Sequence, residues 1–127
     1  MALSYSIDAQ EKLLRLQAWG EVTVEALIAV LNQARADPQF QPDMNALADY
    51  REAHGSWDFS EIQRLRDYIH QVEVPCEVRW AAVLKPGELV GAGHVLIVIS
   101  EAVGARIRMR MFDDAQQALR WIRREVD

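Results

Sequence analysis

The chain has 127 residues, half of them apolar and 26% charged, which is the composition of a folded globular protein rather than of a disordered segment. At this length we expect a single domain, residues 1–127, with a core that needs no disulfide or metal. The formal net charge of −5 argues against nucleic acid as a main partner, because phosphate backbones attract clustered Lys and Arg.

The sequence shows no signal for secretion or for stable membrane insertion. The N-terminus lacks a basic segment that leads into an apolar one, and the longest apolar run, around residues 95–99, is far shorter than the roughly 20 residues of a membrane-spanning helix. Cys76 is the only cysteine, so no intrachain disulfide can form. We therefore expect a cytoplasmic protein.

The first 38 residues predict a hairpin followed by a helix. Apolar and polar side chains alternate over residues 12–19, as in a strand, and residues 5–7 predict a shorter strand beside it. Gly20 is expected to end the second strand. Thr23 is expected to cap the helix, which stops at Asp37 because a proline follows.

A third strand is predicted at residues 44–50 and an irregular connection at residues 51–59. The Ser60 side chain is then expected to accept from the backbone N–H of Gln63 and so begin a second helix, which closes at Val74. The irregular connection thus follows the carboxyl end of the third strand.

Two strands flank one ambiguous segment in the second half of the chain. Residues 78–84 are typical of a buried parallel strand. Residues 89–103 are almost wholly apolar, and periodicity alone does not separate helix from strand there. The length of this segment and its place between two strands favour a buried crossover helix, ended by Gly104.

The last strand alternates between apolar and cationic residues. One side carries Ile107, Met109 and Met111, and the other carries Arg106, Arg108 and Arg110, so we expect this strand at a sheet edge. The arginines are either a surface for an anionic partner or a solvated edge that discourages pairing between sheets.

Asp113 with Gln116 signals the start of a final helix. Its apolar residues recur at helical spacing and predict one inward face. That face is expected to contain Ala115, Ala118, Leu119, Ile122 and Val126.

The order of these elements predicts an α/β fold, ββαβαβαβα, with a mostly parallel five-stranded sheet and an antiparallel N-terminal strand. Short motifs accompany this order at residues 20–23, 37–40, 47–51, 112–113, 118 and 121–122. Together they resemble the SpoIIAA-like branch of the STAS fold, small bacterial proteins related in architecture to anti-sigma factor antagonists and often compared with CRAL-TRIO lipid carriers. The resemblance implies a non-enzymatic binding or regulatory module.

Ligands of open α/β sheets bind beyond the carboxyl ends of the strands. We expect this place to hold a ligand or partner site formed by Asp49, Arg51, His54 and Trp57. Arg51 and the first N–H groups of the second helix suit an anion, and Trp57 suits an apolar or aromatic ligand. Purely structural roles are the alternative, with Asp49 tying down the loop and Trp57 folded onto the core.

Two serines near this place are candidates for phosphorylation or anion binding. In anti-sigma factor antagonists the loop after the third strand carries a phosphorylatable serine, within a motif resembling Asp-Ser-Ser-Gly-Leu-Gly. That motif is absent from this sequence, and by position Ser56 and Ser60 are the residues that fit the role. Their simpler roles are those of a loop residue and a helix cap.

The sequence contains no pattern for catalysis, a cofactor or a metal. Its three histidines have no second ligand at i+3 or i+4, and the glycines at 87, 91 and 93 fall short of the dinucleotide-binding pattern. A nucleophile elbow and a phosphate-binding loop are likewise missing. We therefore predict no catalytic residue, cofactor or metal.

Four functions stay open at this level, of which an enzyme is the least favoured. The leading one is a module that recognises a protein partner or a small anionic ligand near the end of the third strand. The second is a carrier of a small apolar or lipid-like molecule, indicated by the very apolar residues 89–99. The third is a homodimer that associates through Trp19, Trp80 or the crossover segment.

Overall fold

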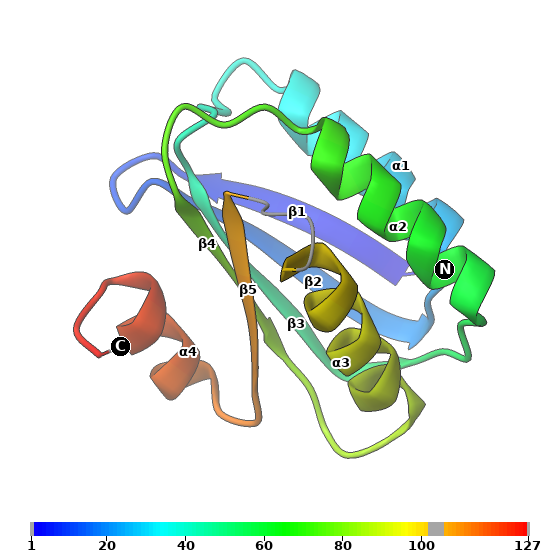
Figure 1. Ribbon diagram of the computed structural model, residues 1–127. Coiled ribbons are helices and arrows are strands. Elements are labelled where there is room, and N and C mark those ends of the chain that lie inside the picture. The colour runs from blue at the N-terminus through cyan, green and yellow to red at the C-terminus, as the bar shows by residue number, and fades with distance from the viewer. Residues whose placement is uncertain (1, 102–105, 127) are drawn as a thin grey trace.

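A five-stranded sheet forms the centre of the computed structural model, which describes residues 2–101 and 106–126 (Figure 1). The strands lie in the order β1-β2-β3-β4-β5; β1 is antiparallel to β2, and the remaining pairs are parallel. The elements along the chain are β1 (Ala2–Asp8), β2 (Leu13–Glu21), α1 (Val24–Ala36), β3 (Asn45–His54), α2 (Phe59–Gln71), β4 (Val78–Val83), α3 (Glu88–Glu101), β5 (Ile107–Phe112) and α4 (Ala115–Ile122). The predicted element order and sheet are confirmed.

The helices cover the two faces of the sheet unequally. Figure 1 shows α1, α2 and α3 on one face and α4 alone on the other. The larger core cluster joins Leu16 of β2 and Ala48 of β3 to residues of α1 and α2, such as Leu27 and Leu65. The smaller cluster packs α4, through Trp121, against the opposite face.

Strand alternation explains this division. Leu14 and Leu16 of β2 belong to the larger cluster, whereas Leu13 belongs to the smaller one. In β3 the same alternation sends Ala48 to the larger cluster and Leu47 to the α4 side. Successive side chains of β2 and β3 therefore pack alternately into the larger cluster and the smaller one.

The second and third strands, β2 and β3, are both longer than predicted. Gly20 does not end β2, which continues to Glu21. It adopts a left-handed φ of +72° within the strand, a conformation that glycine tolerates. β3 runs on to His54 instead of ending at Tyr50, and its pairing with β2 shifts between Gln17 and Trp19, as at a β-bulge. Residues 51–54, expected to be irregular, are therefore strand.

Two helix starts also differ from the sequence prediction. Asp58, not Ser60, caps α2: its carboxylate accepts from the N–H of Glu61, whose side chain accepts from the N–H of Asp58. Asp114, not Asp113, caps α4 and accepts from the N–H of Gln116. The cap is an aspartate one or two residues from the predicted position in each case; Asp58 forms a full capping box with Glu61, and Asp114 accepts from the N–H two residues on.

The other predicted landmarks mostly agree with the structure. Thr23 caps α1, which ends before Asp37 as expected. The ambiguous apolar segment is helical as α3 over residues 88–101, whereas residues 102–104 of the prediction lie outside the described residues. Val126 was expected to face inward but is 38% exposed, because α4 ends at Ile122.

The position of β5 at the sheet edge is also confirmed. Ile107 and Met109 pack into the larger core cluster, while Arg106 and Arg108 are exposed. Within residues 2–101 and 106–126, no helix has the length and apolar character required to cross a membrane.

Candidate functional site

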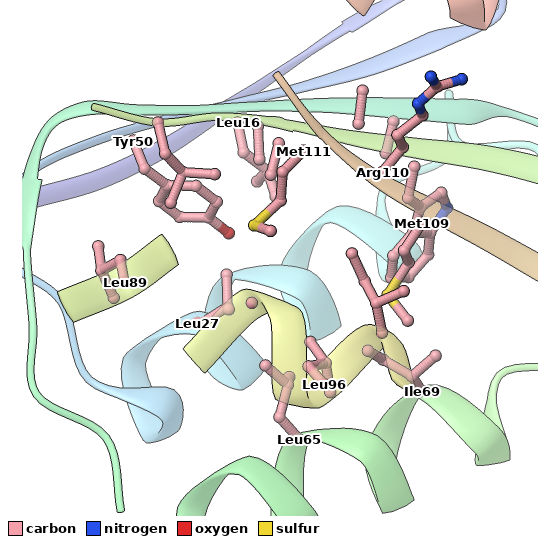
Figure 2. A pocket seen from close by; sticks show the side chains of 18 of the residues that line it. Leu16, Leu27, Tyr50, Leu65, Ile69, Leu89, Leu96, Met109, Arg110 and Met111 are labelled. Atoms are coloured by element: carbon pink, nitrogen blue, oxygen red, sulfur yellow. The ribbon is translucent and has the colours of Figure 1, made fainter. Parts of the chain in front are cut away.

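An apolar cavity of about 110 Å³ lies between the sheet and the three helices α1, α2 and α3 (Figure 2). Four strands, β2, β3, β4 and β5, form one side of its wall, and the three helices form the other. Its lining includes Leu16, Leu27, Tyr50, Leu65, Ile69, Leu89, Leu96, Met109 and Met111.

Small residues in the strands leave this space unfilled. Ala46 and Ala48 of β3 line the cavity from the sheet, and the helices that cover this face contribute leucines to the same lining. On the opposite wall, Gly93 allows α3 to come close to β5, because a β-carbon there would lie only 2.5 Å from Sδ of Met111. Ala46, Ala48 and Gly93 therefore contribute small side chains, or none, to the lining.

Tyr50 places a hydroxyl group within this apolar wall. Figure 2 shows that hydroxyl directed into the cavity, while the guanidinium group of Arg110 points away from it. Among the described residues the Tyr50 hydroxyl has no hydrogen-bond partner. Burial raises the pKa of Tyr50, so the group is a neutral hydrogen-bond donor at physiological pH.

Trp57 also lines the cavity, but its polar atom is already used. Its Nε1 donates to the carbonyl oxygen of Val22 at 2.9 Å, and its ring packs against the larger core cluster. Gly55 supports this arrangement, since a β-carbon there would lie 2.7 Å from the same carbonyl oxygen. Trp57 is therefore a fixed part of the wall rather than a cover at the rim.

Helix α3 is the least tightly packed wall of the cavity. Its sequence is apolar on nearly every side, yet only Leu89 and Ala92 among its apolar residues are fully buried, and Val98 is 65% exposed. By contrast, five apolar residues of α1 are fully buried. Fewer buried contacts mean that less free energy opposes a displacement of α3 than of α1.

The predicted site residues Asp49 and Arg51 lie on the other side of the sheet from the cavity. They line a polar groove with Ser4, Gln17 and residues of neighbouring strands. Nε and Nη2 of Arg51 donate to the two carboxylate oxygens of Asp49 at 3.0 and 2.7 Å. The Arg51 guanidinium holds the pKa of the Asp49 carboxyl below its usual value, and Asp49 in turn occupies the group expected to hold an anion.

The remaining predicted residues are found in two further places. His54 and Ser56 line a rim hollow of about 270 Å³ together with Lys85 and Glu88. Ser60 lies in the first turn of α2 and donates to the Asp58 carboxylate at 3.0 Å. The six residues expected in one neighbourhood are therefore distributed over both faces and the rim.

The cavity residues that the sequence prediction missed had a weak signal. Ala46, Ala48 and Tyr50 alternate along β3, which places two small side chains and one hydroxyl on the same face of a strand. That pattern indicates space beside a polar group. It does not indicate that Gly93 and Met111, from separate elements, complete the wall.

No family model matches the sequence, and no curated protein matches it. Among solved structures, the fold is similar to an uncharacterised protein of the DUF3478 family with a SpoIIAA-like fold, from Shewanella loihica PV-4. The two share 21% sequence identity with a TM-score of 0.61, and the match covers 95% of this chain and 94% of the other. The chain therefore has a SpoIIAA-like α/β fold, as the sequence motifs indicated.

Proposed function

We propose that this protein is a non-enzymatic STAS-type module that binds a small apolar molecule carrying one hydrogen-bond acceptor. The observation that carries the proposal is the Tyr50 hydroxyl, which is directed without a partner into an apolar cavity beneath α3. Ligand pockets typically combine an apolar lining with a few polar groups that fix orientation. Tyr50 is that group here.

The size of the cavity limits the ligand. An apolar cavity of about 150 Å³ can hold a benzene molecule, so a space of about 110 Å³ suits a ring or short chain of similar or smaller size. The lining is almost wholly apolar, so filling this space would remove apolar surface from water. Burial of that surface would provide the main driving force for binding.

The weak packing of α3 supports access for the ligand. The cavity lies against a helix whose apolar residues are mostly half-buried, so a displacement of α3 would widen the cavity with a small loss of buried contacts. A molecule with a longer apolar tail would be accommodated in the same way. The proposal therefore also covers a carrier of a lipid-like molecule, whose apolar tail is longer.

The lining favours binding over chemistry. Its described residues include no histidine, cysteine or carboxylate, and Arg110 contributes to the wall with its guanidinium turned away. Tyr50 by itself supplies a donor but no base or nucleophile in reach of a ligand. A molecule bound here would be retained and released unchanged.

Thermal unfolding in the presence of benzene tests this proposal. Binding to the folded state raises the unfolding midpoint, by an amount equivalent to about 2.7 kcal/mol at a hundred times the dissociation constant. The Ala48→Leu variant fills the cavity and should lose the effect, while Ala9→Leu, in an exposed turn, should keep it. An equal response from the parent and from Ala48→Leu would refute binding in the cavity.

Recognition of a partner or anion at the rim is the second candidate function. The hollow of about 270 Å³ beside His54 and Ser56 supports it, and Lys85 supplies a cation there. The start of α2 is less suited to an anion, because the Asp58 carboxylate already accepts from its N–H groups. Phosphate should raise the unfolding midpoint of the parent and not of Lys85→Ala if this hollow is an anion site.

A further inference from the structure

The N-terminal end of β5 carries a cluster of guanidinium groups. Nη1 of Arg106 approaches the carbonyl oxygen of Pro75 at 3.4 Å, and Nη2 of Arg124 donates to the carbonyl oxygen of Glu77 at 3.2 Å. Nη1 of Arg108 lies 3.9 Å from the Glu77 carboxylate. Arg106, Arg108 and Arg124, the arginine cluster, thus converge on the short segment that precedes β4.

Positive charge exceeds negative charge in this region. Residues 106–124 contain six arginines and two aspartates, a formal charge of +4 in a chain whose net charge is −5. Arg108 is also the direct cross-strand partner of Arg79, and like charges in such positions repel each other. Nη1 of Arg79 donates to the carbonyl oxygen of Trp121 at 2.7 Å, and within residues 2–101 and 106–126 the carboxylate nearest this pair of arginines in an ion pair is Glu77, 3.9 Å from Arg108.

The backbone of β5 also has a free side. Among the described strands β5 pairs with β4 alone. The carbonyl oxygens of Arg106 and Phe112 accept from β4, at the N–H groups of Val78 and Leu84. Because N–H and C=O groups alternate in direction along a strand, those of Ile107, Met109 and Met111 face the open edge.

We propose that the open edge of β5 and the arginine cluster form a docking surface for an acidic, extended segment of a partner protein. Such a segment would add to the sheet as a sixth strand, through backbone hydrogen bonds to Ile107, Met109 and Met111. Carboxylates at every second residue of the partner would lie on the same side of the sheet as Arg106 and Arg108, because side chains alternate with the same period in both strands.

The arginines give this edge its selectivity. Cationic residues along an edge discourage pairing with neutral or basic strands, and the same residues favour an acidic strand. A long polyanion such as nucleic acid fits less well, since the molecule beyond the cluster carries net negative charge. A short peptide can contact the arginine cluster without lying over the rest of the molecule, which carries net negative charge.

A synthetic nine-residue peptide with Asp or Glu alternating with Val and Thr is the probe for this surface. We expect it to bind the parent protein and to bind Arg106→Gln/Arg108→Gln at least tenfold more weakly, because two charge-assisted contacts are removed. The matched control is Arg15→Gln/Arg64→Gln, which removes the same charge from arginines outside the cluster and should bind as the parent does.

Hydrogen exchange distinguishes strand addition from simple charge attraction. On binding, the amides of Ile107, Met109 and Met111 should exchange more slowly, while a scrambled peptide with its acidic residues in one block should not protect them. The proposal is overturned if the alternating and scrambled peptides bind equally, if those amides stay unprotected, or if single-stranded DNA binds more tightly with the same dependence on Arg106 and Arg108. Failure to bind either peptide also overturns it and leaves the cavity proposal unaffected.

Discussion

Gly93 of α3 lies directly against the side chain of Met111 of β5. A β-carbon at position 93 would lie 2.5 Å from Sδ of Met111 and 3.6 Å from its Cγ and Cε. The obstructing atoms belong to the flexible end of one side chain rather than to backbone. Both residues line the cavity, so the space available to a ligand depends on this contact.

Gly93→Ala should therefore weaken ligand binding more than it weakens the fold. Alanine favours the helix by about 1 kcal/mol over glycine, which offsets the displacement of Met111. The free energy of unfolding is expected to stay within about 1 kcal/mol of the parent, while the benzene-induced midpoint shift falls by at least half. A denaturant titration with and without benzene measures both, and an undiminished shift would contradict the assignment of Met111 to the wall.

Gly55→Ala, unlike Gly93→Ala, should mainly reduce the stability of the fold. The added β-carbon would meet the Val22 carbonyl oxygen at 2.7 Å, and that oxygen also accepts from Nε1 of Trp57. Because backbone cannot yield as a methionine tip does, we expect a loss of about 1–3 kcal/mol of stability. Urea unfolding measures this loss, and a variant as stable as the parent would show that the connection at residues 55–58 is less constrained than the structure indicates.

Tyr50→Phe should stabilise the protein in the absence of ligand. Tyr50 is half-buried in an apolar wall and its hydroxyl has no hydrogen-bond partner among the described residues, so we expect its removal to gain up to about 1 kcal/mol. Differential scanning calorimetry of the parent and variant tests this. Tyr68→Phe is a useful contrast, because the Tyr68 hydroxyl donates to Asn32 and should cost stability when removed.

The Asp49–Arg51 pair predicts a dependence of stability on pH. The pKa of folded Asp49 lies below its ordinary value of 3.8, mainly because of the hydrogen bond from Arg51. Its stabilisation is therefore fully present above that ordinary value and is lost as the pH falls through the lower, folded pKa. The stability difference between the parent and Arg51→Gln should shrink below about pH 4.

The matched variant for this pH series is Arg64→Gln, which changes the same charge on the surface of α2. No ion pair of Arg64 is present within the described part of the chain, so its stability difference from the parent should vary little over the same pH range. If the two variants follow the same pH profile, the Asp49–Arg51 pair contributes nothing specific to stability.

Cys76 offers a direct measure of the electrostatic potential at the arginine cluster. It is exposed, and its neighbours Pro75 and Glu77 are the residues that Arg106 and Arg124 contact. An anionic aromatic disulfide should react with Cys76 faster, relative to a neutral one, in the parent than in Arg106→Gln/Arg108→Gln. An unchanged rate ratio would show that the cluster is neutralised within the protein.

The sequence predicted the fold well because its signals are local and repeated. Alternation over residues 12–19 and along β5 reports which face each side chain takes, and helical spacing reports the inward faces of α1 and α2. The helix starts were less certain for a physical reason: Asp58 with Glu61 and Ser60 with Gln63 both fit a capping box, and only one can lie at the helix end.

The candidate site was much harder to predict. Asp49, Arg51 and Trp57 are close in sequence, but alternation along β3 sends Asp49 and Arg51 to the opposite side from Tyr50. The cavity depends on small residues that come from different elements, Ala48 in β3 and Gly93 in α3. Which small residues face one another is decided by packing between elements, and the sequence does not display that packing.

Cyclopentanone and methylenecyclopentane test the central claim most directly, because the two molecules have the same shape and differ in one hydrogen-bond acceptor. We expect the ratio of their dissociation constants, measured by titration of parent and Tyr50→Phe, to shift about tenfold against the ketone when the hydroxyl is removed. A ratio that is the same for both proteins, or no binding of either molecule to the parent, would contradict a ligand site built around Tyr50.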